Sequence, residues 1–294
     1  MRLGTILGAL ALLLPLAAPA GAQTVGERAF RSDMIKRVQA KLPDAEVTPD
    51  PDDFLALHVK GGVLDGATIN LHRIYEYCAG HSAEDCETLK QDFTGKMTSP
   101  NPDPTVASLR LMVRDRVYLE NLLEMERRSA AEGKNFHYVY EQIGEDLFAI
   151  LVSDAPDKVA ILPDDSLKDL GLTRKTAWAK AAKQTRDALP PLPKPDQLKA
   201  SAVAFQEYEY LPSLLLDLPA WARIAEAVGP DLFVTAVSDG FVFAGTMPDD
   251  AVAEFAETVA EDCAEQERCI SPHIYRFRDG RWVIARAPGD GASR

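Results

Sequence analysis

Asp146–Asp165 reads DLFAILVSDAPDKVAILPDD, and the same pattern returns at Asp231–Asp250 as DLFVTAVSDGFVFAGTMPDD. Nine of the twenty aligned positions are identical at an offset of 85 residues, without a gap. Each copy predicts an apolar strand, a turn, a returning strand and a helix that begins at Pro-Asp-Asp, because proline and acidic residues suit the first turn of a helix. A repeat at a fixed spacing indicates a repeated supersecondary unit. We therefore predict an internal duplication of one β-hairpin–helix unit.

A third hairpin–helix unit is predicted upstream, without the sequence identity of the other two. Phe54–Val59 alternates in polarity, Gly61-Gly62 marks a turn, and Val63–Ile69 returns as a second strand. Asn70 then caps a helix. The expected fold class is α+β, with helices packed on antiparallel sheet and repeated hairpin–helix units, of which the second and third come from the duplication.

The first 22 residues have the pattern of a cleavable signal peptide. Arg2 supplies a basic start, Ile6–Leu16 is apolar, and the small residues Ala20-Gly21-Ala22 form a cleavage signal. We expect cleavage after Ala22 and a periplasmic or secreted mature protein. No later stretch has the length and apolarity of a membrane span.

Composition suggests one boundary in the mature chain. Pro190–Pro195 reads PPLPKP, which excludes a helix or a central strand and predicts an extended connector. We expect an N-terminal α+β region at residues 23–189, with the first and second hairpin–helix units. A C-terminal α+β region at residues 196–287 holds the third unit, and residues 288–294 form a frayed tail.

The chain is acidic, with 45 Asp and Glu against 32 Lys and Arg and a formal net charge of −13. Nucleic-acid affinity depends largely on clustered Lys and Arg, so we expect no nucleic-acid partner. The same charge disfavours binding to anionic membrane surfaces. The expected partner is an unidentified protein or small molecule in the cell envelope.

All four cysteines fall in two close pairs, Cys78/Cys86 and Cys263/Cys269. Close, even pairs in an exported chain favour disulfides. Separations of eight and six residues correspond to about 12 Å and 9 Å in a continuous helix, whereas bridged Cα atoms lie within about 7 Å. We therefore expect two disulfides, with a break in the helix at each.

The sequence offers ligands for two candidate metal sites, but the spacing of these residues matches no recognised metal-binding motif. His72 and His81 with the first cysteine pair would supply zinc ligands, but they fit no established zinc motif. Asp154 and Asp239 occupy equivalent predicted turns and would supply calcium ligands, but the calcium-loop pattern is missing. Four more aspartates stand at the predicted helix starts: Asp164, Asp165, Asp249 and Asp250. Aspartate commonly stabilises turns and helix N-termini, so we predict no metal and no cofactor, and keep Asp154 and Asp239 as candidate polar positions.

The sequence assigns no catalytic residue. Ser213 and Ser271-Pro272-His273 supply the residue types of a nucleophile and a base. However, the chain has no Gly-x-Ser-x-Gly elbow, no Gly-rich phosphate loop and no His-Glu-x-x-His helix. The catalytic residues stay unknown at this level.

Two other groups of residues favour structural roles. Arg110, Arg114 and Arg116 form a short basic cluster, for which a solvated face is favoured over an anion site. Aromatic residues at such positions lie more often in a core than around a pocket. The aromatic group contains Tyr208, Tyr210, Trp221 and Trp282.

Three segments also suggest a relationship. They are Gly66–Leu71 (GATINL), Ile143–Pro156 (IGEDLFAILVSDAP), and Ser213–Asp217 followed by Asp231–Val237. Their order and spacing resemble the bacterial YtpQ family of uncharacterised proteins, over most of the mature chain. The signal peptide and the cysteine pairs depart from the typical intracellular members. The resemblance implies a shared fold and carries no reaction with it.

These observations favour a non-catalytic binding or interaction module of the cell envelope. Identity between the two copies falls on turn and helix-start positions, as a scaffold requires. The alternative is a hydrolase with its site in a cleft between the two repeated units. A cluster of polar side chains at non-equivalent positions of the copies would favour that alternative.

Overall fold

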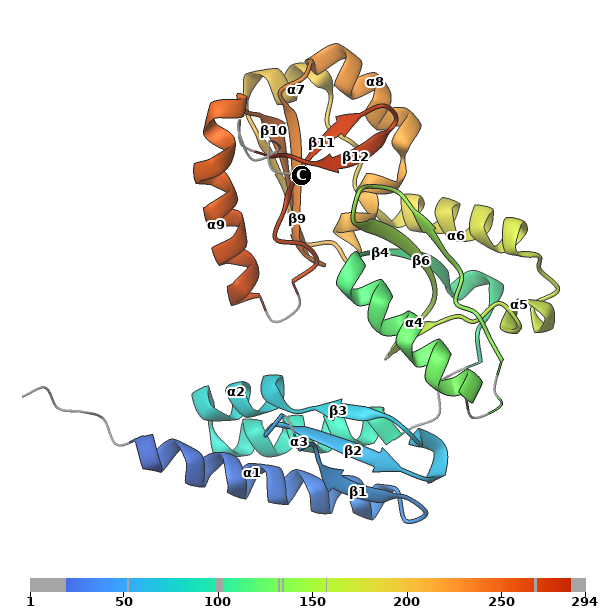
Figure 1. Cartoon of the computed structure of the whole chain (residues 1–294), viewed down its shortest axis with the longest axis vertical. Helices are drawn as coiled ribbons and strands as arrows, with labels where there is room; N and C mark the ends of the chain where they lie inside the picture. Colours follow the sequence, from blue (N-terminus) through green and yellow to red (C-terminus); the bar gives the residue numbers. More distant parts are fainter. Residues whose placement is uncertain are drawn as a thin grey trace, which may run out of the picture. The chain divides into compact units, whose positions relative to one another are not determined.

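The computed structural model describes residues 20–51, 53–98, 103–131, 133, 135–156, 158–266 and 269–286. The chain forms two compact units, Met1–Pro100 and Asn101–Arg294, each built of helices and antiparallel strands (Figure 1). The α+β prediction is confirmed. Most of the expected signal peptide, residues 1–19, and the expected tail at 288–294 lie outside the described residues.

In the first unit, the described residues form a three-stranded antiparallel sheet, in the order β1-β2-β3, with three α-helices. Its elements follow the chain as α1 (Ala20–Lys41), β1 (Glu46–Pro49), β2 (Ala56–Lys60), η1 (Gly62–Leu64), β3 (Thr68–Asn70), α2 (His72–Gly80) and α3 (Ala83–Thr98). Phe30, Met34 and Val38 recur every four residues along α1 and are buried. They pack with Leu57 and Val59 of β2, because alternate residues of a strand share a face.

The predicted hairpin of this unit is present, but the segment that connects its two strands differs from the predicted tight turn. β2 pairs with β3 through Leu57 opposite Ile69, but a 3₁₀ turn, η1, lies in the connection in place of a tight Gly61-Gly62 turn. β1 was not predicted. It is four residues long and ends at Pro49, and a short proline-ended strand at a sheet edge carries little sequence signal.

In the second unit, the part of the chain that the structure describes forms two antiparallel sheets. The first has four strands, in the order β4-β6-β5 with β7 also paired to β6, and the second has five, in the order β12-β11-β9-β10-β8. The strands of the first sheet are β4 (Leu109–Asp115), β5 (Tyr140–Gln142), β6 (Leu147–Ala155) and β7 (Lys158–Ile161). Those of the second are β8 (Val203–Phe205), β9 (Leu232–Ser238), β10 (Phe241–Thr246), β11 (Ile274–Arg278) and β12 (Arg281–Ile284).

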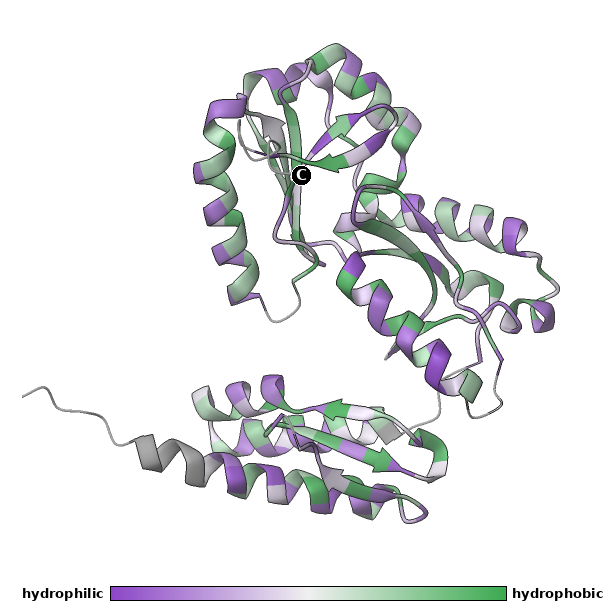
Figure 2. Ribbon diagram, in the orientation of Figure 1, coloured by the Kyte–Doolittle hydropathy of each residue, from purple (hydrophilic) through white to green (hydrophobic). Residues whose placement is uncertain are grey.

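Helices cover both faces of each sheet in this unit. They are η2 (Val106–Ser108), α4 (Arg116–Ala131), α5 (Ser166–Asp169), α6 (Arg174–Ala188), α7 (Pro195–Ala200), η3 (Leu211–Leu216), α8 (Leu218–Val228), η4 (Asp249–Ala251) and α9 (Val252–Glu265). The coverage explains why Leu147 to Val152 of β6 are all buried, and why the central strands are mostly hydrophobic in Figure 2. A strand buried on both faces has no polar alternation.

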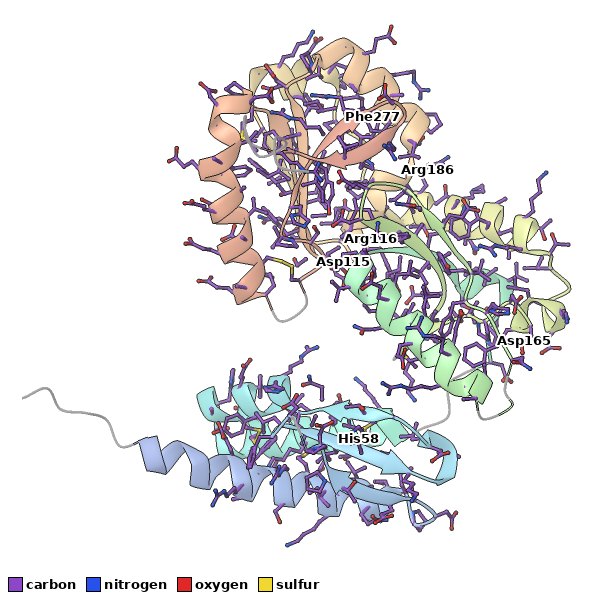
Figure 3. The ribbon with its side chains drawn as sticks, in the orientation of Figure 1. His58, Asp115, Arg116, Asp165, Arg186 and Phe277 are labelled. Carbon is purple, nitrogen blue, oxygen red and sulfur yellow. A yellow bond between two sulfur atoms is a disulfide. The ribbon has the colours of Figure 1, made fainter. Side chains whose placement is uncertain are left out.

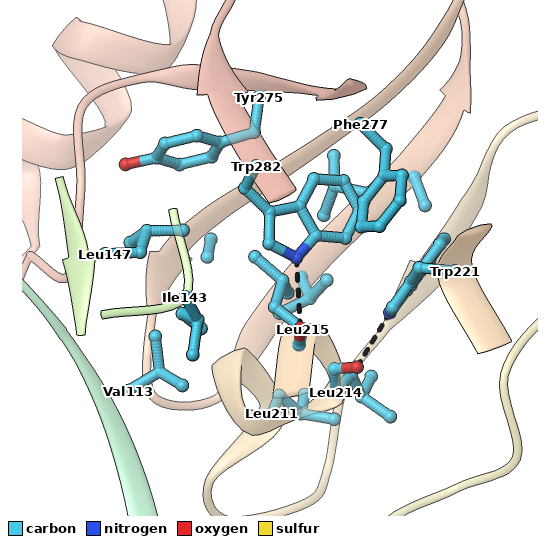
Figure 4. Close-up of a cluster of buried hydrophobic side chains, with 14 of the residues drawn as sticks. Val113, Ile143, Leu147, Leu211, Leu214, Leu215, Trp221, Tyr275, Phe277 and Trp282 are labelled. Atoms are coloured by element: carbon cyan, nitrogen blue, oxygen red, sulfur yellow. Dashed lines mark hydrogen bonds between the residues drawn. The ribbon is translucent and has the colours of Figure 1, made fainter. Parts of the chain in front are cut away.

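The largest hydrophobic cluster joins the two sheets (Figure 4). Val113 and Leu147 of the first sheet lie in one cluster with Trp282 of the second. Trp282 Nε1 donates to Leu215 O at 3.0 Å, and Trp221 Nε1 donates to Leu214 O at 2.7 Å. Both indoles are fully buried in this core, as expected for these aromatic residues.

The structure places the boundary between compact units elsewhere than the sequence suggested. It lies after Pro100, and Pro190–Pro195 falls inside the second unit. Pro190–Lys194 is neither helix nor strand, as predicted, and Pro195 begins α7. However, Leu189 and Leu192 pack against the largest cluster. A proline-rich composition fixes the backbone conformation but does not decide whether neighbouring side chains enter a core.

The two repeat segments share the order of their elements and an antiparallel pairing of their two strands, but not the register of that pairing. In the second copy Leu232, at the start of β9, pairs with Thr246. The equivalent Leu147 pairs instead with Asp115 of β4, because the β6–β7 ladder begins only at Val152. The following helices also differ, since α5 has 4 residues and α9 has 14. The internal duplication stays a prediction from the sequence.

Candidate functional site

Both candidate aspartates lie beside arginines of β4. Arg114 is buried, and its Nη1 and Nη2 donate to Asp239 Oδ1 and Oδ2 at 2.7 and 2.9 Å. Arg110 Nε lies 3.9 Å from Asp154 Oδ2. Residues 110 and 114 face the same side of the strand, so one face of β4 holds both pairs. Arg114 is therefore part of the interior, in contrast to the solvated face expected for this basic cluster.

The two aspartates are not equivalent in structure. Asp239 lies in the turn between Ser238 and Phe241, as predicted. Asp154 lies within β6, opposite Val159, because the first hairpin turns later in the chain. The predicted equivalence of the two turn positions is therefore wrong, and each carboxylate has an arginine as its neighbour.

The residues proposed for zinc are engaged in other interactions. Cys78 and Cys86 lie at disulfide distance, with Cα atoms 4.7 Å apart. His72 Nε2 lies 2.9 Å from Asp53 Oδ1, and the His81 ring stacks on Tyr77. In the part of the chain that the structure describes, no group of three or more His, Cys, Asp or Glu side chains is arranged to hold a metal ion.

The helix-start aspartates contact protein groups as well. Asp249 Oδ1 accepts a 2.9 Å hydrogen bond from Arg276 Nη2, and Asp164 Oδ1 accepts from the His137 backbone N–H at 3.4 Å. These two carboxylates therefore bind groups of neighbouring segments, whereas Asp165 at the start of α5 makes no side-chain cap hydrogen bond.

Ser213 has a structural role at the edge of the sheet, where β4 has no neighbouring strand on one side. Its Oγ donates to Leu111 O at 2.9 Å, and Thr185 Oγ1 accepts from Leu111 N at 2.8 Å. Gln184 Nε2 reaches Leu109 O at 3.3 Å. Side chains thus satisfy backbone groups that an edge strand would otherwise offer to another chain.

Ser271 and His273 belong to a buried polar cluster between the two sheets. Tyr275 of β11 donates from its hydroxyl to Asp146 Oδ1 at 2.9 Å, and Ser271 Oγ lies 2.5 Å from the same hydroxyl. His273 Nε2 lies 3.7 Å from Asp146 Oδ2. Asp146 directly precedes β6, so this cluster joins the start of one repeat to the strand beside the other.

Burial dominates the electrostatics of this cluster. It raises the pKa of Asp146, although the Tyr275 hydrogen bond and His273 oppose the shift. The charge of Asp115, which ends β4 beside Arg116 (Figure 3), adds to the increase in the pKa of Asp146. Burial also raises the pKa of Tyr275 well above its ordinary value. The tyrosine therefore stays a hydrogen-bond donor over the physiological pH range.

The cluster does not have the geometry of a serine nucleophile. Ser271 is fully buried, and its Oγ contacts the Tyr275 hydroxyl. The hydrogen bond recorded between Ser271 and His273 involves the histidine backbone N–H, at 3.2 Å from Oγ. A general base has to reach the nucleophile with its side chain. The arrangement is suited to holding the two sheets together.

A hollow of about 200 Å³ opens between β10 and α9. Phe241 and Phe243 of β10 line it with Phe255 and Val259 of α9, over Thr235 and Val237 of β9. The three phenylalanines are only partly buried. Phe243 and Phe255 stand 6.2 Å apart between ring centroids.

A second hollow of about 240 Å³ continues along the same helix. It shares Phe255 with the first and is otherwise lined by Met247, Ala251, Glu254 and Thr258. We call the two hollows together the α9 groove. The groove follows one side of α9, because its lining positions on the helix recur every three or four residues.

The α9 groove is acidic at its rim. Its lining includes the carboxylates of Glu254 and Asp262 and, among the described residues, no Lys or Arg. The sequence has no basic residue between Arg223 and Arg268. The α9 groove thus combines an aromatic floor with a negatively charged rim.

Both ends of α9 are tied to the sheet beneath it. Arg276 of β11 is buried, and its guanidinium donates to Asp231 O, Met247 O and Asp249 Oδ1, at 2.6, 2.8 and 2.9 Å. At the other end Cys263 and Cys269 lie at disulfide distance, with Cα atoms 5.1 Å apart, and the Ile270 backbone N–H donates to Val237 O of β9 at 2.8 Å. The helical wall of the groove is therefore anchored near both of its ends.

The sequence predicts which side chains of the groove share a face of their strand or helix. Phe241 and Phe243 alternate along a predicted strand and must share a face. Phe255, Val259 and Asp262 recur at helical spacing. The pattern shows that each set shares a face, but it does not reveal that the two faces leave space between them. Of the aromatic residues singled out by sequence, Trp221 and Trp282 lie in the core, whereas Tyr210 is partly buried and Tyr208 is exposed, so the core prediction is wrong for Tyr208.

No described helix has the length and apolarity that a bilayer crossing requires. The chain matches no protein-family model, no curated protein sequence and no solved structure.

Proposed function

We propose that this is an exported, non-catalytic binding module of the cell envelope, and that the α9 groove is its binding site. The observation that carries the proposal is the groove itself, with partly exposed aromatic side chains on a floor fixed at both helix ends. Preorganised sites bind better because less conformational freedom is lost on association.

Export is supported by the signal-peptide pattern of Met1–Ala22 and by the two cysteine pairs at disulfide distance. Disulfides persist mainly in oxidising compartments. We further propose that the chain is an exported relative of the YtpQ family, on the three segments that resemble it. That relationship brings no reaction and leaves the groove as the main functional feature.

The hydrolase alternative has weaker support. The serine nucleophile that the sequence offers between the two repeats, Ser271, is fully buried with its Oγ against the Tyr275 hydroxyl. A fluorophosphonate probe, which labels reactive serines covalently, is expected to leave the protein unmodified. Labelling of Ser271 that is abolished by His273→Ala would favour the hydrolase instead.

The binding proposal is tested by filling the groove. Thr258 is exposed and lines the second hollow, so Thr258→Trp adds a large side chain there without replacing a core residue. Ala260→Trp is the matched control, because Ala260 is exposed on the same helix and does not line either hollow. Phage-displayed random peptides would be selected on the mature protein and re-tested on both variants.

Peptides that bind the wild type and Ala260→Trp, but lose at least tenfold in affinity for Thr258→Trp, are the expected result. Selected peptides that bind all three proteins equally would contradict the proposed site. Failure to select any peptide would contradict a peptide-binding function for the module.

A further inference from the structure

We propose that the α9 groove takes a basic peptide segment in extended conformation, with large apolar side chains flanked by Lys or Arg. This inference rests on the proposed binding function and names the chemistry of the partner. It is carried by three features of the groove: its size, its length and its charge.

The size of the hollows favours side chains over a small-molecule ligand. They measure about 200 and 240 Å³, and Phe255 lines both. Pockets for drug-sized ligands commonly enclose about 300–1,000 Å³. Two smaller apolar hollows in a row suit two side chains projecting from one backbone.

The length of the groove fits a short extended peptide. Its helical wall runs from Ala251 to Asp262, eleven steps along η4 and α9. At about 1.5 Å per residue this wall is about 16 Å long. An extended chain rises about 3.3 Å per residue, so about five residues fill it.

The charge of the groove selects a cationic partner. Glu254 and Asp262 stand at the rim, and both are exposed. Lys and Arg flanking an apolar side chain would meet these carboxylates, and the cationic groups are also attracted to the faces of the exposed phenylalanines. The same charge disfavours an acidic peptide, a nucleic acid or an anionic membrane.

The test uses three dye-labelled hexapeptides and the full mature protein, with binding measured by fluorescence polarisation. The basic peptide is Lys-Leu-Lys-Phe-Lys-Lys. The acidic one has Glu in place of every Lys, and the polar one has Ser in place of Leu and Phe. We expect the basic peptide to bind at least tenfold more tightly than either of the others.

Salt provides a readout that needs no variant. Exposed ionic contacts are screened when the Debye length falls from about 30 Å at 0.01 M to about 3 Å at 1 M. Binding of the basic peptide is expected to weaken at least fivefold over that range. Affinity that is unchanged or stronger at high salt would overturn the charge argument.

Charge reversal locates the contact. The double variant Glu254→Lys with Asp262→Lys is expected to lower the affinity for the basic peptide about tenfold and to improve binding of the acidic one. Glu257→Lys with Glu261→Lys is the matched control, with the same net change on exposed positions of the same helix that line neither hollow. If both double variants lose the same affinity for the basic peptide, the peptide is attracted by the overall negative charge of the protein and the proposed contact at the groove is wrong.

The outcomes separate this inference from the proposed function. If the acidic and basic peptides bind equally and both lose affinity in Thr258→Trp, the groove binds peptides but the inferred charge preference is wrong. If no peptide responds to Thr258→Trp, the binding site itself is wrong. Binding of the polar peptide as tightly as the basic one would remove the role of the apolar hollows.

Discussion

Arg114 and Asp239, 125 residues apart, form a two-point ion pair that links β4 to the turn between β9 and β10. The guanidinium is buried, whereas the carboxylate keeps about a third of its side-chain surface exposed. The pair thus connects the two sheets of the second unit at the place where the sequence repeat makes its turn. Arg114 also donates to its own strand, at Val113 O.

Asp239→Ala is expected to destabilise the protein, because it leaves a buried guanidinium without its partner. Breaking a buried pair costs about 3–5 kcal/mol, and the partial exposure of Asp239 reduces the expectation to about 1–3 kcal/mol. Urea unfolding measures the change. Asp154→Ala is the control, since its arginine contact is 3.9 Å long, and a loss as large as that of Asp239→Ala would contradict the assigned role.

Asp146→Asn is expected to become more stable relative to the wild type as the pH rises. Burial raises the pKa of Asp146 in the folded state, so folding favours its protonated form. Protonated Asp146 stabilises the folded protein by its largest amount when the pH lies below 3.8, the pKa of an unperturbed aspartate. This stabilisation is lost as the pH rises through the raised pKa of the folded state. Asparagine keeps an oxygen for the Tyr275 hydroxyl and does not ionise.

The measurement is urea unfolding of both proteins between about pH 3 and pH 8, within the range where acidic groups of shifted pKa titrate. Asp33→Asn supplies a control of opposite sign. Although burial raises the pKa of Asp33, hydrogen bonds from Lys90 and Arg37 lower it overall. The wild type should therefore gain stability over Asp33→Asn with rising pH, and equal pH trends for the two variants would contradict the assignment.

Gly144→Ala is expected to destabilise the junction between β5–β6 and β12. A Cβ atom at Gly144 would lie 2.9 Å from Trp282 Cβ and 3.0 Å from Trp282 O. Trp282 is fully buried in the largest cluster, so the clash has to shift packed atoms, at about 1–3 kcal/mol. Gly240→Ala is the control, because no atom lies within 4 Å of its added Cβ. Thermal unfolding should separate the two variants.

Both cysteine pairs are expected to be oxidised in the mature protein. Peptide mapping without reductant should recover the Cys78–Cys86 and Cys263–Cys269 linkages, and free thiols at all four positions would contradict the prediction.

Replacing either cysteine pair by alanine should lower the free energy of unfolding by about 2 kcal/mol, because each disulfide closes only a short loop. Loss of the second pair should also weaken peptide binding, because Cys263 anchors one end of α9.

The sequence by itself determined the features that depend on neighbours along the chain. The apolar run of Leu147–Val152 predicted a buried strand, and the alternation of Leu109, Leu111 and Val113 agrees with β4. The spacing of the cysteines predicted short local links with a break in each helix, and the chain does leave the helix within each pair. Such features follow from backbone periodicity and from the short reach of side chains within a few residues.

Only the tertiary structure decided how these elements meet. The repeat in sequence did not fix the strand registers, because Leu147 pairs with β4 while Leu232 pairs with β10. Asp146 reaches Tyr275 across 129 residues, and no local pattern encodes that contact. The α9 groove likewise depends on tertiary packing, because Phe241 of β10 and Phe255 of α9 line one hollow although they belong to separate elements. Long-range packing selects among arrangements that local periodicity leaves equally possible, and the candidate binding site is one of its consequences.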